Sequence, residues 1–194
     1  MADLSLTRRI ALGLMHPTEI AAPFHRDGWV YEEKVDGFRM AAVKVENCLG
    51  LISRDGTHYT RRFPELVAAI GALDPETFLL DGELAMPEQG PPAHVEGSRE
   101  GPPNESASLP VYIVFDVLEL GGRDLRREPL KERRLALEEL TAGQNLIWPA
   151  RRLSSNGLRA WAQAIHGGCE GMVAKDEESP YVPGRTLQWL TLTR

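Results

Sequence analysis

Long apolar runs are missing from this chain of 194 residues, since no stretch of 18 apolar residues occurs and no membrane-spanning helix is expected. The N-terminus also lacks a basic segment that leads into an apolar stretch and a small-residue cleavage site. Cysteine is scarce: Cys48 and Cys169 match no metal-ligand spacing, which favours buried free thiols over a disulfide or a zinc site. We therefore expect a cytoplasmic protein with no membrane partner.

An excess of basic charge is missing as well, because the formal net charge is -6. A protein that grips duplex DNA alone usually shows a basic footprint, since phosphate neutralisation supplies most of that affinity. Any contact with nucleic acid is therefore expected to come from a local patch or from a partner. The length and the hydrophobic share of 42% fit one domain spanning residues 1–194.

Apolar patterning predicts alternating strands and helices. Strands are expected at 29–45 (two strands around a turn at Asp36-Gly37, where Gly37 can take φ > 0), 49–54, 78–85, 111–118, 145–148, 171–175 and 187–192. Helices are expected at 63–73, with Pro64 in the first turn, at 129–140, and at 155–166 after a Ser/Asn cap. Mostly antiparallel strands with helices between them indicate the α+β class.

Residues 87–110 hold six prolines and three glycines but almost no large apolar side chain. Such a segment cannot bury enough apolar surface to order itself. We expect a disordered surface loop there.

The sharpest motif is EEKVDGFR at residues 32–39, which sets Lys34 at the end of a predicted strand. A lysine attacks phosphorus only as a neutral amine, whereas a free ammonium with a pKa of ~10.4 is almost wholly charged at pH 7. Burial, neighbouring cations or a metal must therefore lower the pKa of Lys34 if it is a nucleophile. Alone, the motif also suits a solvated lysine at a hairpin.

Further motifs follow in order: SRDG at 53–56, LDGEL at 80–84, VFDV at 114–117 and EGMVAK at 170–175. With Lys34, this set resembles the covalent nucleotidyltransferase superfamily of DNA ligases, RNA ligases and mRNA capping enzymes. The tail SPYVPGR at 179–185 most resembles ATP-dependent bacterial DNA ligases associated with end joining. The resemblance implies an ATP-grasp-like nucleotidyltransferase fold, with two antiparallel sheets flanked by helices around a nucleotide pocket.

The resemblance also implies roles for individual residues, with ATP as the nucleotide. Lys34 would take AMP through a phosphoramidate, and Lys175 would contact the α-phosphate. The other implied nucleotide contacts are Glu32 to the adenine amino group, Arg39 and Arg54 to ribose or phosphate, Phe115 stacked on the purine, and Arg185. Glu83 and Glu170 would hold Mg²⁺ or Mn²⁺, for which carboxylates are suitable hard ligands. Phe115 also suits a core position, and Asp81 and Asp116 are expected to support the sheet rather than contact the ligand.

Two features depart from the family pattern. The last motif normally carries two lysines, and the aligned residues here are Thr191 and Thr193, which removes about two positive charges near the departing pyrophosphate. We therefore expect this chain to be adenylated less efficiently than a family member that carries both lysines. The chain also ends where such ligases continue into an OB-fold domain, so we expect that domain to be absent and a partner protein to supply its function.

The preferred interpretation is an adenylyltransferase domain of an ATP-dependent DNA ligase, which acts in DNA repair and recombination with nicked DNA as its acceptor and RNA as a possible substitute. A second hypothesis is a ligase-derived domain that binds nucleotide or a repair partner without completing catalysis, and the two threonines favour it. A third is an RNA ligase or a GTP-using capping enzyme, which the 179–185 tail fits less well.

Overall fold

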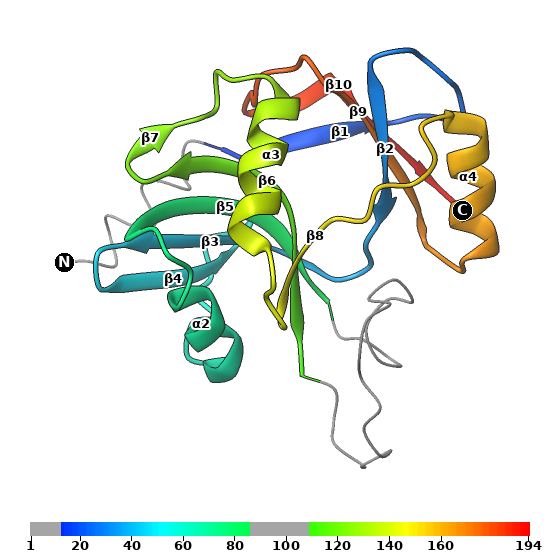
Figure 1. Ribbon diagram of the computed structural model, residues 1–194. Coiled ribbons are helices and arrows are strands. Elements are labelled where there is room, and N and C mark those ends of the chain that lie inside the picture. Colours follow the sequence, from blue (N-terminus) through cyan, green and yellow to red (C-terminus); the bar gives the residue numbers. More distant parts are fainter. Residues whose placement is uncertain (1–12, 86–108) are drawn as a thin grey trace.

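The computed structural model describes residues 13–85 and 109–194, which form two β-sheets and three helices (Figure 1). The predicted α+β class is confirmed. The loop predicted over 87–110 falls almost wholly on residues 86–108, which lie outside the described residues. In the described part of the chain, no helix is long and apolar enough to cross a membrane.

The smaller sheet has four strands in the order β1 (Met15–Glu19), β10 (Gly184–Thr193), β9 (Gly171–Asp176) and β2 (Trp29–Lys34). β9 pairs antiparallel with both β10 and β2, whereas β1 runs parallel to β10. The sequence did not predict β1. Its centre is Pro17, which cannot donate a ladder hydrogen bond and is therefore confined to edge strands such as this one.

The larger sheet follows the order β4 (Cys48–Ser53), β3 (Phe38–Val45), β5 (Thr77–Ala85), β6 (Val111–Leu120) and β7 (Arg123–Asp124). The short strand β8 (Ile147–Pro149) pairs with β6 in parallel. The pairing is mostly antiparallel, as predicted, with parallel pairing added at β1–β10 and β6–β8. In both cases the two paired strands are far apart in the sequence, as β1 is from β10 and β8 is from β6. The apolar pattern within one segment carries no information about such a pairing.

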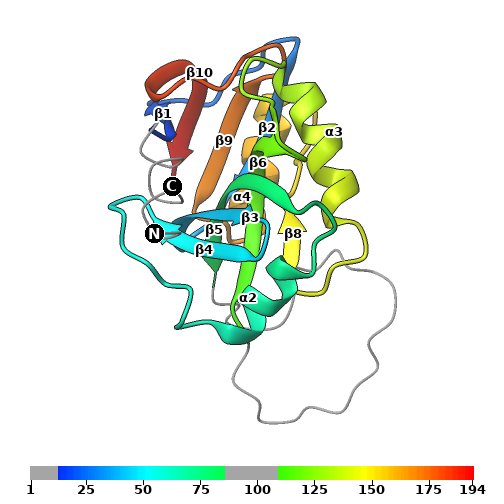
Figure 2. The same cartoon turned by 90° about the vertical axis from the view of Figure 1, so that its left-hand side faces the viewer.

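β2 and β3 do not form the predicted hairpin. β2 pairs with β9 in the smaller sheet, and β3 pairs with β4 and β5 in the larger one. The chain crosses between the sheets at Val35–Gly37, so Lys34 ends one sheet beside the start of the other (Figures 1 and 2). Gly37 does not take a positive φ; it is needed because a Cβ there would lie 2.3 Å from the carbonyl oxygen of Leu84.

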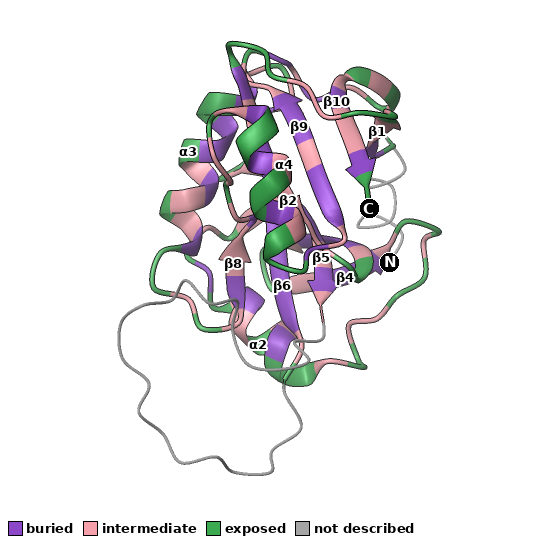
Figure 3. Ribbon diagram, turned by 90° about the vertical axis from the view of Figure 1, so that its right-hand side faces the viewer, coloured by how far each residue is buried: buried purple, intermediate pink, exposed green. Residues whose placement is uncertain are grey.

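Three helices cover the sheets: α2 (Pro64–Gly71), α3 (Leu130–Thr141) and α4 (Gly157–His166). α2 begins with Pro64, where a missing N–H costs nothing. α4 is capped by Asn156, whose side chain accepts hydrogen bonds from the backbone N–H groups of Leu158 and Arg159. α3 packs along β6, and α4 covers β2 and β9 (Figure 3).

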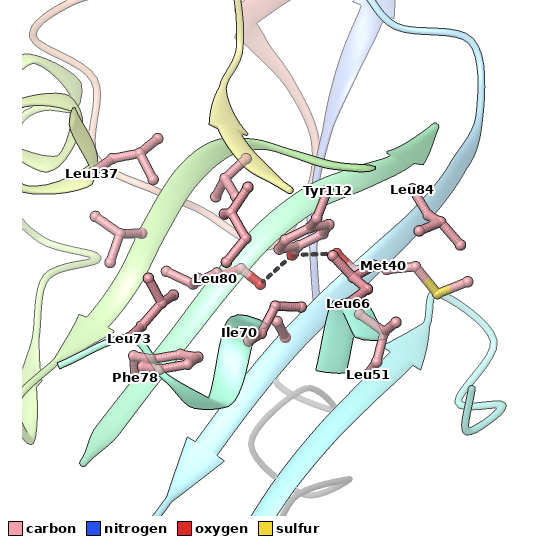
Figure 4. Packing of buried hydrophobic residues seen from close by; sticks show 14 of the residues in the cluster. Met40, Leu51, Leu66, Ile70, Leu73, Phe78, Leu80, Leu84, Tyr112 and Leu137 are labelled. Carbon is pink, nitrogen blue, oxygen red and sulfur yellow. Dashed lines mark hydrogen bonds between the residues drawn. The ribbon is translucent and has the colours of Figure 1, made fainter. Parts of the chain in front are cut away.

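The largest hydrophobic cluster lies where α2 and α3 pack against the larger sheet (Figure 4). Tyr112 crosses this cluster, and its buried hydroxyl lies within hydrogen-bonding distance of the carbonyl oxygens of Met40 (2.9 Å) and Leu80 (3.3 Å). A buried hydroxyl is tolerated only with such partners. This side of β3, β5 and β6 is therefore core, and the opposite side is free to face the smaller sheet.

Candidate active site

A pocket of about 200 Å³ lies between the two sheets. It is lined by Pro17, Glu32, Glu33, Lys34, Val35, Arg39, Glu83, Phe115, Ala150, Val173, Lys175, Trp189 and Thr191. Most of the site residues predicted from the sequence are in this lining. The fold thus brings together motifs that lie more than a hundred residues apart in the chain.

The pairing register explains why these side chains share one face of the smaller sheet. Glu32 of β2 lies opposite Val173 of β9, which lies opposite Thr191 of β10. The neighbouring row on the same face runs from Lys34 through Gly171 to Thr193. Because side chains alternate along a strand, both rows point toward the pocket side.

Lys34 is the last residue of β2, and its amine forms an ion pair with the carboxylate of Glu170. Glu170 directly precedes β9, opposite the end of β2. Both side chains are only partly buried, with exposed fractions of 26% for Lys34 and 35% for Glu170. The amine is therefore held at the pocket edge beside a group that can accept its proton.

Glu32 and Lys175 form a buried pair at the base of the pocket. Lys175 Nζ lies 2.6 Å from Glu32 Oε2, and Arg134 Nη1 of α3 lies 3.0 Å from Glu32 Oε1. Burial lowers the pKa of Lys175, and the nearby Glu32 carboxylate opposes that shift. Two basic side chains, one from β9 and one from α3, thus hold the Glu32 carboxylate in position.

Arg39 is held by Asp81 in a two-point pair, with Nε to Oδ1 at 3.0 Å and Nη2 to Oδ2 at 2.7 Å. Its Nη2 also donates to the carbonyl oxygen of Met15 at 2.7 Å, while Tyr181 donates to Asp81 at 2.6 Å. The network joins β3 and β5 to the edge of the smaller sheet. Asp81 has no exposed surface, and it holds the guanidinium of Arg39 in position without lining the pocket itself. This is the supporting role that was expected.

Phe115 lines the pocket and contacts Trp189 edge to face, with ring centroids 6.1 Å apart. Lys175 Nζ lies 4.9 Å from the Phe115 centroid and 4.2 Å from that of Trp189. Phe115 is partly buried and packs at the edge of two hydrophobic clusters. The ring therefore packs against the core and also lines the pocket, and its stacking on a purine stays a prediction.

Burial raises the pKa of Glu83 to about 7; Asp81 and Glu170 add to the rise, and Arg39 and Lys34 oppose it. A divalent cation between Glu83 and Glu170 would relieve this repulsion. Mg²⁺ is commonly bound by one or two carboxylates plus phosphate oxygens and water, so this pair fits it. The described residues contain no group of three or more metal-ligating side chains, and phosphate and water would complete the shell.

Glu83→Gln is expected to be more stable than the parent at pH 8 and equally stable near pH 4.5. Below the usual value of 4.5 the carboxyl is protonated in both the folded and unfolded states, whereas above about 7 the folded state must bury a charge. The parent therefore loses stability as the pH rises from 4.5 to 7, by on the order of 1–3 kcal/mol. Urea denaturation without divalent metal, at both pH values, measures the difference.

The exposed Glu76 supplies the matched control, since Glu76→Gln should shift stability equally little at both pH values. Adding Mg²⁺ should favour the parent over Glu83→Gln at pH 8. A Glu83→Gln stability difference that does not change with pH would contradict the assigned pKa.

Arg54 and Arg185 are not in the pocket lining. Arg54 follows β4 in an exposed turn, and Arg185 is an exposed residue of β10. Both lie close enough to His16 to help lower its pKa, after burial and Arg39. They therefore stand at the rim near Arg39, and their predicted contact with the nucleotide remains a prediction.

Two buried arginines of α3 were missed by the sequence analysis. Arg134 holds Glu32, and Arg133 forms a two-point pair with Asp116 at 2.7 and 2.9 Å, both partners being without exposed side-chain surface. A signal was available, because both residues fall three and four positions after Leu130 on the helical stripe that also contains Leu137. An arginine on an apolar stripe requires a buried acid. Asp116 is thus a supporting residue, as expected.

A lysine at a strand end, paired carboxylates beside it and an aromatic wall between two sheets define a nucleotidyltransferase-type domain. A family model described as the ATP dependent DNA ligase domain matches residues 11–192. The chain belongs to this family, and the resemblance seen in the sequence is confirmed.

Similar proteins include the SPbeta prophage-derived DNA ligase-like protein LigB of Bacillus subtilis (strain 168), which is 32% identical over 180 residues, or 91% of this chain and 64% of that protein. The multifunctional non-homologous end joining protein LigD of Mycolicibacterium smegmatis is 34% identical over 172 residues, or 87% of this chain and 22% of that protein. The chain thus spans less than two thirds of each relative.

Solved structures confirm the fold. The ligase domain of LigD from M. tuberculosis has a TM-score of 0.74 at 26% identity, with 93% of this chain and 59% of that chain covered. A mycobacterial DNA ligase D complexed with ATP and MES has a TM-score of 0.75 at 24% identity, with 95% and 60% covered. The two-sheet architecture around the pocket is therefore that of the ligase nucleotidyltransferase domain.

Proposed function

We propose that this chain transfers AMP from ATP to Lys34 as the first step of polynucleotide strand joining. The observation that carries the proposal is the position of the Lys34 amine, at the pocket edge between the sheets and paired with Glu170. Membership of the ATP-dependent DNA ligase family and the likeness to a ligase complexed with ATP support it.

In the proposed step, the neutral Lys34 amine attacks the α-phosphorus of ATP, a P–N bond forms and the bond to pyrophosphate breaks. The lysine proton passes to water. Lys175 and Arg39 stabilise charge on the α-phosphate oxygens, Glu32 contacts the adenine and Phe115 stacks on it. Arg54 and Arg185 contact the ribose or the α-phosphate from the rim. Fixed charges of this kind contribute most of the stabilisation in phosphoryl transfer.

The residues that would hold Mg²⁺ are Glu83 and Glu170. Bound there, the ion supplies Lewis-acid stabilisation of phosphate oxygens. Metal binding requires ionised carboxylates. Because the pKa of Glu83 is raised to about 7, we propose that the affinity for Mg²⁺ falls at acidic pH.

The acceptor in this proposal is nicked DNA, with RNA as a second candidate. Relatives named as end-joining and ligase proteins motivate DNA. We also propose that residues 1–194 act as one adenylation domain in the cytoplasm, and that an OB-fold or another DNA-binding surface outside these residues completes the nick-sealing step.

The test is covalent labelling of the full chain by ATP with Mg²⁺. Label from α-³²P-ATP should survive denaturation and be released by acid, as expected for a P–N bond, whereas label from γ-³²P-ATP should not be retained. GTP labelled at the α-position should give no product. Retention of the γ-label would indicate phosphorylation instead, and efficient labelling by GTP would favour a capping-type enzyme.

A domain that binds nucleotide or a repair partner without chemistry is the competing function. Family membership does not favour it, and the Lys34–Glu170 and Glu32–Lys175 pairs have no evident purpose in such a scaffold. Complete absence of label on folded protein that binds ATP would reverse this preference.

A further inference from the structure

Two buried polar atoms on β10 have no hydrogen-bond partner in the described part of the chain. They are the indole Nε1 of Trp189 and the hydroxyl Oγ1 of Thr191. Both residues line the pocket between the sheets. Burial without a partner is unfavourable for a polar group, and such atoms call for an explanation such as a bound ligand that supplies the missing partner.

Thr191 is a partly buried residue of the pocket lining, and its hydroxyl oxygen is buried. It shares a cross-strand row with Val173 and Glu32, and Glu32 is only 2% exposed. Thr193, in the neighbouring row with Lys34, is exposed and is not in the lining. Rotation by about 120° around the Cα–Cβ bond of Thr191 can move its hydroxyl to the position that the methyl group now holds, so the hydroxyl can turn toward a ligand. That ligand would be the deeply bound part of the nucleotide.

The cations of the pocket lining are already paired. Lys34 pairs with Glu170, Lys175 with Glu32 and Arg39 with Asp81. Glu83, whose carboxyl group is close to Arg39 and Lys34, also lines this pocket. Additional negative charge on a ligand therefore meets no unpaired cation in the described lining, and the two lining residues of β10, Trp189 and Thr191, offer it only neutral donors.

Resting on the proposed function, we propose that Thr191, together with the Trp189 indole N–H, is a specificity-determining contact to the adenylate part of the nucleotide. The hydroxyl binds an oxygen of the ribose or α-phosphate and does not reach the β- and γ-phosphates. The pocket consequently recognises the transferred AMP group and gains little affinity from the length of the polyphosphate.

The test is a titration of AMP, ADP and ATP into the full chain in EDTA, so that only protein groups contribute. The three affinities should agree within about fivefold, since no charge-assisted contact to the outer phosphates is expected. Thr191→Val should weaken all three by about threefold to tenfold, the usual loss for one neutral hydrogen bond. Thr191→Ser should restore affinity, because it keeps the hydroxyl.

Stability separates this role from a structural one. Thr191→Val replaces an unpartnered buried hydroxyl with a methyl group, so the unliganded protein should be as stable as the parent or more stable. The exposed Thr193→Val is the matched control and should change neither affinity nor stability. Thr191→Lys should make ATP bind at least about tenfold more tightly than AMP, since it adds a cation that can reach phosphate.

Affinity that rises steeply from AMP to ATP in the parent would overturn the inference, as would unchanged affinity in Thr191→Val or the absence of nucleotide binding. Failure of the proposed function is read separately, from α-³²P label in Mg²⁺. If the protein is labelled but its affinity rises steeply from AMP to ATP, the proposed function holds and this inference fails. If the protein is not labelled, but the three affinities are equal and Thr191→Val weakens them, this inference holds and the proposed function fails.

Discussion

Lys34→Ala is expected to reduce covalent labelling by α-³²P-ATP by more than about 10³-fold, equivalent to over ~4 kcal/mol in activation free energy. The substitution removes the lysine that ends β2 beside the carboxylate of Glu170. Lys34→Arg should be equally inactive, because a guanidinium stays protonated and cannot attack phosphorus. Labelling followed by denaturing electrophoresis measures the effect.

Lys131→Ala is the control for this experiment. Lys131 lies on the exposed side of α3, where it pairs with Glu178 at 2.5 Å, and it is not in the pocket lining. It should label like the parent. If Lys34→Ala kept its label, peptide mapping should locate the adenylated residue, and a signal on Lys175 would assign the nucleophile to the other lysine of the pocket.

Asp116→Ala is expected to lower the free energy of unfolding by about 3–5 kcal/mol, because it leaves the buried guanidinium of Arg133 without its counterion. Arg133→Met should cost a similar amount for the opposite reason. The double variant Asp116→Leu/Arg133→Met removes both charges and should lose clearly less than the sum of the single losses. Urea denaturation followed by circular dichroism gives the values.

The exposed Lys131–Glu178 pair provides the comparison on the same helix, and Lys131→Ala should cost no more than about 1 kcal/mol. Because Arg133 also donates to the carbonyl oxygens of Glu128 and Ser179, Arg133→Met frees two further acceptors. Losses that simply add in the double variant would mean that Asp116 and Arg133 act independently. The buried pair would then not be what joins α3 to β6.

The buried ion pairs also explain how the site depends on elements without catalytic residues. α3 supplies Arg134 to Glu32 and Arg133 to Asp116, and Asp116 follows Phe115 directly in β6. Displacing α3 would therefore disturb both the base of the pocket and its aromatic wall. This arrangement makes α3 a support for the proposed adenine site.

Local patterning predicted most elements well. The helix starting at Pro64, the helix capped by Asn156 and the central strands β5 and β6 all lie close to their predicted positions, because capping chemistry and apolar periodicity act within a few residues. β1 was not predicted because it is short and contains Pro17. Its hydrogen-bonding partner is β10, which lies at the far end of the described chain.

The amino-acid order alone was sufficient to identify the family motifs, the candidate nucleophile Lys34 and the unusual threonines, because these are matters of residue type and spacing. It could not show that β2 and β3 belong to different sheets, that Arg134 reaches Glu32, or that Arg54 and Arg185 stand outside the pocket lining. These features arise when segments distant in the chain pack together, and buried charges must then find partners wherever the fold provides them.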